Sequence, residues 1–242
     1  EEITIPSSVT SIKESVFSEC SSLKNISLHN NITSINANAF AGCTSLTNIS
    51  IPSSIISINN GVFNKCFSLK KIVLPSSLIC IGNNAFYSCS SLEEIIIPSL
   101  VTSIGDYAFY DCSSLKKISL PASLKVIGKQ VFQGVKTLDI YGDIENISSN
   151  LFSECLSLTN VTIQSSVITI EDNAFSRCSS LTQVNIPFSV KSIGKKAFYS
   201  CNALSDIIMP SSLITIKESA FLSCKSFNLK KLILKYLKFN IN

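Results

Sequence analysis

The stretch LEEIIIPSLVTSIGDYAFYDC, residues 92–112, carries a pattern that recurs along nearly the whole chain. Its first apolar run, Ile95–Ile97, has the length and β-branched side chains of a short strand. Pro98 ends that strand, because proline has no N–H to donate to a ladder. A second extended piece follows at Val101–Ile104. Gly105 then permits a tight turn, and the next four residues suit one helical or 3₁₀ turn.

Phenylalanines mark the repeat. Successive markers lie 23 residues apart, except for one interval of 20, and all seven prolines stand eleven residues before a marker. An isoleucine precedes every marker by five residues, and a cysteine follows nine of them by three. A unit this short cannot bury its own apolar face, so copies must stack around a shared core. We predict a solenoid of about ten repeats, a single domain over residues 1–242, with one buried column of the markers: Phe17, Phe40, Phe63, Phe86, Phe109, Phe132, Phe152, Phe175, Phe198 and Phe221.

The consensus Leu-x-x-Ile-x-Ile-Pro-x-Ser-Val-x-x-Ile-Gly-x-x-Ala-Phe-x-x-Cys-x-x-Leu resembles the BspA-like family of leucine-rich repeats, and residues 99–120 follow it nearly position by position. The resemblance implies a leucine-rich-repeat solenoid: a right-handed arc with a parallel β-sheet on the concave face, short second strands, and 3₁₀ or helical turns elsewhere. It also implies a surface protein of the kind found in bacteria and protozoan parasites, which adheres to host or matrix proteins.

Two functional hypotheses stay open. The first is a non-catalytic protein-binding module, on the cell surface or secreted, that recognises host or extracellular-matrix proteins. The second is a cytoplasmic scaffold for protein interactions, which the many cysteines favour if they are reduced.

Two segments depart from the repeat. In the irregular repeat near residues 133–152, three residues are missing, Val135 replaces the cysteine and Tyr141 replaces the proline. This repeat is either a partner site or an ordinary degenerate copy. The segment 225–242 is also irregular, and the chain opens in the second half of a repeat. We therefore expect a fragment of a longer protein.

The cysteines look structural. Nine of the ten share one repeat position, and no Cys-x-x-Cys pair or zinc-like Cys/His cluster is present. A disulfide needs the Cβ atoms of two cysteines to face each other, which an in-register column does not favour. We expect a column of reduced, buried thiols. The only histidine, His29, falls at a strand end, where we expect it to be exposed. We expect no enzyme, no metal and no cofactor.

Charge and hydropathy narrow the partners. The net charge is only +4, and no run of five basic residues occurs, so nucleic acid is not implied. No apolar run approaches the ~18 residues of a membrane span, so we expect no direct membrane insertion in this segment. The partner that the resemblance implies is a protein, such as an extracellular-matrix or host surface protein.

Residues that flank the inward isoleucines of the predicted strands should point outwards onto the concave face. A central part of this face combines charged, apolar and aromatic side chains, which favours a contact surface for a partner. The alternative interpretation is that the face is merely a solvated sheet. Glycans on the Asn-x-Ser/Thr sequons at Asn25, Asn48 and Asn160 would cover the same face. The predicted contact strip consists of Lys71, Val73, Glu94, Ile96, Lys117, Asp139 and Tyr141.

Overall fold

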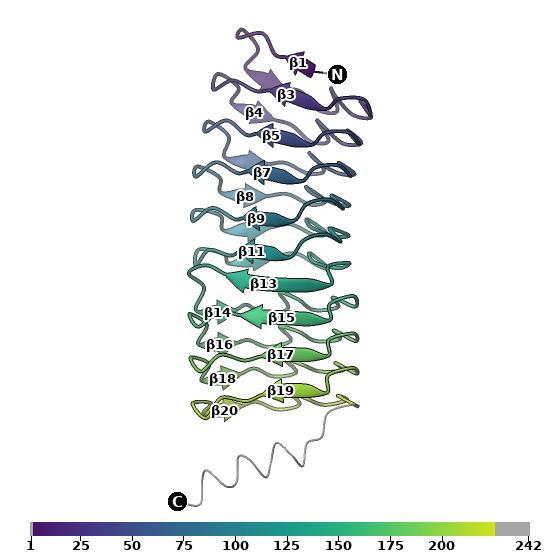
Figure 1. The fold of residues 1–242 in the computed structure, drawn as a ribbon. Coiled ribbons are helices and arrows are strands. Elements are labelled where there is room, and N and C mark those ends of the chain that lie inside the picture. The colour runs from purple at the N-terminus through teal and green to yellow at the C-terminus, as the bar shows by residue number, and fades with distance from the viewer. Residues whose placement is uncertain (1, 226–242) are drawn as a thin grey trace, which may run out of the picture. The chain divides into compact units, whose positions relative to one another are not determined.

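The computed structural model describes residues 2–225, which belong to two compact units that divide between Lys136 and Thr137. The division falls inside the irregular repeat near residues 133–152. Each unit is a stack of coils, and each coil carries two short strands (Figure 1). Residues 226–242, which include nearly all of the irregular segment 225–242, lie outside the described residues.

In the first unit, each coil has a three-residue first strand and a two-residue second strand. The first strands are β1 (Glu2–Thr4), β3 (Asn25–Ser27), β5 (Asn48–Ser50), β7 (Lys71–Val73), β9 (Glu94–Ile96) and β11 (Lys117–Ser119). The second strands are β2 (Ser11–Ile12), β4 (Ser34–Ile35), β6 (Ser57–Ile58), β8 (Cys80–Ile81), β10 (Ser103–Ile104) and β12 (Val126–Ile127).

The second unit repeats this order, but its initial strands vary in length. The first strands are β13 (Thr137–Tyr141), β15 (Asn160–Ile163), β17 (Gln183–Asn185) and β19 (Asp206–Ile208). The second strands are β14 (Asn146–Ile147), β16 (Thr169–Ile170), β18 (Ser192–Ile193) and β20 (Thr215–Ile216).

Within each unit, the pairings between these strands are parallel and join residues 23 positions apart. In the first unit, Asn48 pairs with Lys71, and in the second, Thr137 pairs with Asn160. The same repeat position therefore lies beside itself in the next coil of a unit. This parallel-strand β-solenoid is the leucine-rich-repeat fold that the sequence predicted.

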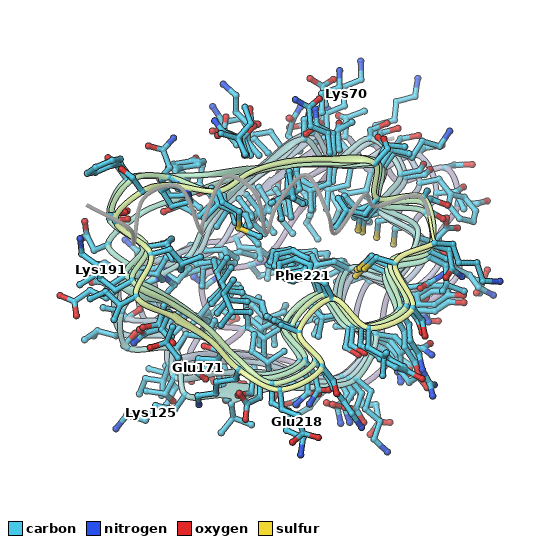
Figure 2. The ribbon with its side chains drawn as sticks, turned by 90° about the horizontal axis from the view of Figure 1, so that it is seen from below. Lys70, Lys125, Glu171, Lys191, Glu218 and Phe221 are labelled. Carbon is cyan, nitrogen blue, oxygen red and sulfur yellow. The ribbon has the colours of Figure 1, made fainter. Side chains whose placement is uncertain are left out.

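The marker phenylalanines form the predicted columns, one within each unit. From Phe17 to Phe132, adjacent rings stack with centroids 5.1–5.7 Å apart. From Phe152 to Phe221, the centroids are 5.2 Å apart. Figure 2 looks along the stack and shows Phe221 pointing into the coil, whereas the labelled Lys and Glu side chains point outwards. Each column thus fills the centre of its unit.

The expected 3₁₀ or helical turn is not confirmed, because the structure has no helix of either kind within residues 2–225. Successive tight turns take its place. Asn84 and Ser88 have positive φ angles of 54° and 56°, which interrupt any right-handed helix. Amide groups also alternate between coils: the Tyr87 N–H bonds within its own turn, to Asn84, whereas the Phe86 N–H bonds to Ala108 of the next coil. A helix would need all these N–H groups for itself.

Gly105 is required for a different reason than the sequence indicated. A Cβ atom there would lie 2.6 Å from the Asn83 backbone nitrogen and 2.3 Å from its Oδ1 atom. The Asn83 Oδ1 atom also accepts a hydrogen bond from the Asp106 N–H, at 2.8 Å. Close approach between two coils therefore favours glycine at this position.

The phenylalanine column should carry much of the stability of the first unit. Replacing the fully buried Phe86 with alanine is expected to lower the free energy of unfolding by ~3–5 kcal/mol, because it leaves a cavity between two rings. The matched control is Phe67→Ala. Because the Phe67 side chain is 43% exposed, this substitution should lower the free energy of unfolding by less than ~1 kcal/mol. Urea unfolding followed by circular dichroism measures both. Equal losses would contradict the role of the column.

Candidate functional site

The outward side chains of the first strands lie in straight rows, because the ladders are in register. We call this surface of the first unit the strand face. Lys117 pairs with Glu94, and Ser119 pairs with Ile96. On the neighbouring pair, Ser50 lies opposite Val73. One row is therefore charged, and the row beside it contains an apolar pair that has serine on either side.

A groove of about 630 Å³, the central groove, crosses the strand face over β7, β9 and β11. Val73 and Ile96 line it and are each 61% exposed, although aliphatic side chains of this size are usually buried. Pro98 and Ser76, which follow the strands, also line the groove. An exposed aliphatic pair in a hollow can receive an apolar group from a partner.

Charged side chains surround this apolar pair. Lys71, Glu94 and Lys117 are the first residues of their strands, and each follows a residue of the same charge in the chain. These preceding residues, Lys70, Glu93 and Lys116, also line the groove. Figure 2 shows Lys70 pointing away from the interior. Two pairs of lysines therefore stand on either side of a pair of glutamates.

The backbone pairing is interrupted beneath the groove. No ladder joins β7 to β9 within the described part of the chain, whereas β5 pairs with β7 and β9 pairs with β11. Just before these strands, the Glu93 N–H donates to the Lys70 carbonyl across a long 3.4 Å. One coil further on, the Lys116 N–H donates to the Glu93 carbonyl at 2.9 Å. The central groove thus lies over an interruption in the sheet.

The structure brings five residues of the predicted contact strip together and leaves two apart from them. Lys71, Val73, Glu94, Ile96 and Lys117 all line the central groove. The remaining two are on β13, in the second unit: Asp139 is exposed and Tyr141 is half-buried. That any of these seven contacts a partner remains a prediction.

Sequence reasoning overlooked a cluster of three tyrosines on the turns of the first unit. The rings of Tyr87 and Tyr110 stack with centroids 4.9 Å apart, and Tyr107 meets Tyr110 edge-on at 5.8 Å. Tyr107 has a φ of 57°, which is uncommon for an aromatic residue. The signal was available, because these tyrosines occupy repeat positions that hold smaller residues in most other copies.

The cysteine column is confirmed as a set of free thiols, and eight of its nine members are buried. Each of several thiols lies near the carbonyl oxygen of the marker phenylalanine in the preceding coil. The Cys66 Sγ atom is 3.2 Å from the Phe40 oxygen, and the Cys89 Sγ atom is 3.1 Å from the Phe63 oxygen. The thiols therefore act as hydrogen-bond donors between coils. Cys80, outside the column, is half-buried and lies 3.2 Å from the Ser57 hydroxyl.

The environment of these thiols suppresses ionisation. Burial raises the pKa of Cys43 from an ordinary value of 9.0 to about 12, and the neighbouring Cys20 thiol adds to the effect. Burial and neighbouring thiols likewise raise the pKa of Cys66 and Cys89. Thiolates are the reactive form of cysteine, so this column is unsuited to nucleophilic catalysis.

His29 is half-buried, so its expected exposure is wrong. Stacking places the ring beside the preceding coil, where Nε2 lies 2.9 Å from the Pro6 carbonyl oxygen. Nδ1 is buried as well. Across residues 2–225, no three His, Cys, Asp or Glu side chains are grouped so that they could hold a metal ion.

The raised thiol pKa values predict a loss of stability in alkali. In this pH range the folded state keeps thiol protons that the unfolded chain releases. The contribution of the buried thiols to folding stability is therefore complete below about pH 9 and is lost as the pH rises towards 12. For each buried thiol, the free energy of unfolding should be about 1–2 kcal/mol lower at pH 10.5 than at pH 8. Urea unfolding at both pH values measures the change.

The control for this prediction comes from the chain itself, because Val135 occupies the cysteine position of its repeat and is fully buried. The triple variant Cys66→Val, Cys89→Val and Cys112→Val should lose clearly less stability between pH 8 and pH 10.5 than the unmodified chain. Identical losses would show that other groups cause the alkaline effect.

Stacked coils with short parallel strands and apolar residues in fixed phase define a leucine-rich-repeat protein. The model of the BspA type leucine-rich repeat region, which includes six copies, matches residues 1–116 and 102–228. The chain therefore belongs to the BspA type leucine-rich repeat family, as the sequence predicted. This family indicates a protein-interaction module, and its fold is typically non-enzymatic.

Solved bacterial structures share the fold. The pneumococcal vaccine antigen PcpA is 22% identical with a TM-score of 0.54, and the match covers 93% of this chain and 64% of that chain. A leucine-rich repeat protein from Eubacterium ventriosum is 24% identical with a TM-score of 0.51, covering 93% of this chain and 82% of that one. None of the curated proteins compared with this chain matches it.

The part of the chain that the structure describes contains no helix with the length and apolar character needed to span a bilayer.

Proposed function

We propose that this chain is a cell-surface adhesion module that binds host or matrix proteins through the strand face. The central groove is the observation that carries the proposal. It combines the exposed Val73 and Ile96 side chains with a rim of charges, the composition expected of a small interface core within a polar border. The fold supports the proposal too, because the pneumococcal vaccine antigen shares it.

An intracellular scaffold is the second candidate function. All ten cysteines are free, and disulfides are common in extracellular proteins, so this observation favours a reducing compartment. The first candidate is compatible with free thiols as well, because burial would protect them from oxidants outside the cell. Biotinylation of intact cells of the source organism separates the two candidates, because only a surface protein is labelled before lysis.

Binding to matrix proteins tests the adhesion proposal directly. The chain is passed over immobilised fibronectin, laminin and collagen, and over intact host cells, and we expect saturable binding to at least one. The double variant Val73→Ser and Ile96→Ser should weaken that binding at least tenfold, because it removes the apolar anchor of the groove.

The matched control makes the same chemical change beside the second strands of the same unit. Ile56 and Ile79 precede β6 and β8 and are 56% and 45% exposed, so Ile56→Ser and Ile79→Ser should leave binding within about twofold. Equal weakening by the two double variants would overturn the assignment to the strand face. Binding to no matrix protein and no cell would overturn the adhesion function.

A further inference from the structure

We infer that the central groove recognises an acidic, extended peptide segment of a protein partner that carries one apolar anchor residue. This inference rests on the proposed binding role of the strand face and adds the chemistry of the partner. Three observations carry it: the surplus of lysine around the groove, the isolated apolar pair within it, and the spacing of the lysines along the stack.

The charge balance of the groove favours a negatively charged partner. Four lysines line it against two glutamates, a surplus of two positive charges, and all six side chains are exposed. The lysines at 71 and 117 occupy the strands on either side of Glu94, which has electrostatic or hydrogen-bonding partners of its own. Carboxylates of a partner could therefore pair with the lysines on either side of the two glutamates.

The apolar pair calls for a specific side chain rather than a uniform charge. Val73 and Ile96 occupy the same repeat position in consecutive coils and line one groove, and their strand partners on the outer sides are Ser50 and Ser119. The apolar surface is thus two residues wide, enough to cover one side chain of leucine or phenylalanine size. Burial of such a side chain stabilises a complex by about 1.5–3 kcal/mol before other costs.

The spacing of the lysines suits an extended chain. Successive coils of a parallel stack lie ~4.8 Å apart, so Lys71 and Lys117, two coils apart, are separated by roughly 10 Å along the stack. An extended peptide advances ~3.3 Å per residue and alternates its side chains, so two carboxylates four residues apart lie on one face, ~13 Å from each other, within reach of both flexible lysine side chains.

A polyanion such as a sulfated polysaccharide fits the same surface less well. Glu93 and Glu94 stand between the two lysine pairs, so a uniformly negative polymer would meet like charge at the centre of the groove. It would also leave Val73 and Ile96 without an apolar partner. The pattern therefore selects a segment that is acidic at both ends and apolar in the middle.

The test uses the whole chain and the fluorescein-labelled peptide Asp-Asp-Thr-Leu-Thr-Asp-Asp, with binding measured by fluorescence anisotropy. We expect a dissociation constant on the order of 0.1 mM at low salt, weakened severalfold at 0.5 M salt. Replacing the leucine of the peptide with serine should weaken binding about tenfold, and the lysine version, Lys-Lys-Thr-Leu-Thr-Lys-Lys, should not bind. Equal binding of the acidic and basic peptides would overturn the inference.

Variants of the chain locate the peptide. Lys71→Glu with Lys117→Glu should weaken binding of the acidic peptide at least tenfold, as should Val73→Ser with Ile96→Ser. The charge-matched control, Lys125→Glu with Lys129→Glu, changes exposed lysines of the same unit that do not line the groove, and should change binding less than twofold. Equal effects of the two lysine double variants would overturn the inference. A second contradicting outcome is that heparin competes with the peptide and still binds the Val73→Ser and Ile96→Ser double variant.

The two proposals fail separately. If a matrix protein binds through Val73 and Ile96 but the acidic peptide does not bind, the adhesion function stands and the partner chemistry is wrong. If the peptide binds as expected and no matrix protein or cell does, the partner chemistry stands and the adhesion function is wrong.

Discussion

Register between coils is the constraint on which each unit of this protein depends. Parallel ladders join residues 23 positions apart, and the same offset stacks phenylalanine on phenylalanine at 5.1–5.7 Å. The thiol–carbonyl contacts depend on it as well, because each joins a cysteine to the marker of the preceding coil. No coil has enough apolar surface to fold alone, so these contacts between neighbours supply most of the cohesion.

The same register organises the surface, although with a different result. Inside, the columns repeat the same or a similar apolar side chain from coil to coil. On the outer surface, the residues differ from coil to coil. A binding surface therefore combines side chains from several adjacent coils. The central groove is such a place, since it combines charged ends from three strands with an apolar pair from two of them. It also lies where no ladder joins β7 to β9 in the described part of the chain.

Much of the interior could be predicted from the sequence, because burial follows repeat position. The phenylalanines and cysteines show it, and so do Leu138 and Ile140, which are buried on β13 despite the irregular repeat around them. The turns could not be predicted in the same way. Left-handed residues such as Asn84 and Ser88 are set by hydrogen bonds to the next coil, which a single repeat does not reveal.

The candidate site was only partly predictable for a related reason. Alternation along a strand places Val73 and Ile96 on the outer surface, but it says nothing about a hollow. The hollow is lined by side chains from three coils, and their combination cannot be read from a single repeat. The half-burial of His29 likewise comes from contact with Pro6 in another coil.

The order of charges across the groove has a consequence for how such a gene can change. Recombination between repeats removes or adds whole coils, and the interior tolerates this because every coil presents the same apolar positions to its neighbours. Loss of the coil that contains β9 would bring the lysines of β7 directly against those of β11, where like charges repel. A coil gained or lost near β1 would instead leave the groove whole and merely shift it along the stack. Variation in repeat number should therefore be tolerated at some junctions and selected against at the two that flank Glu94.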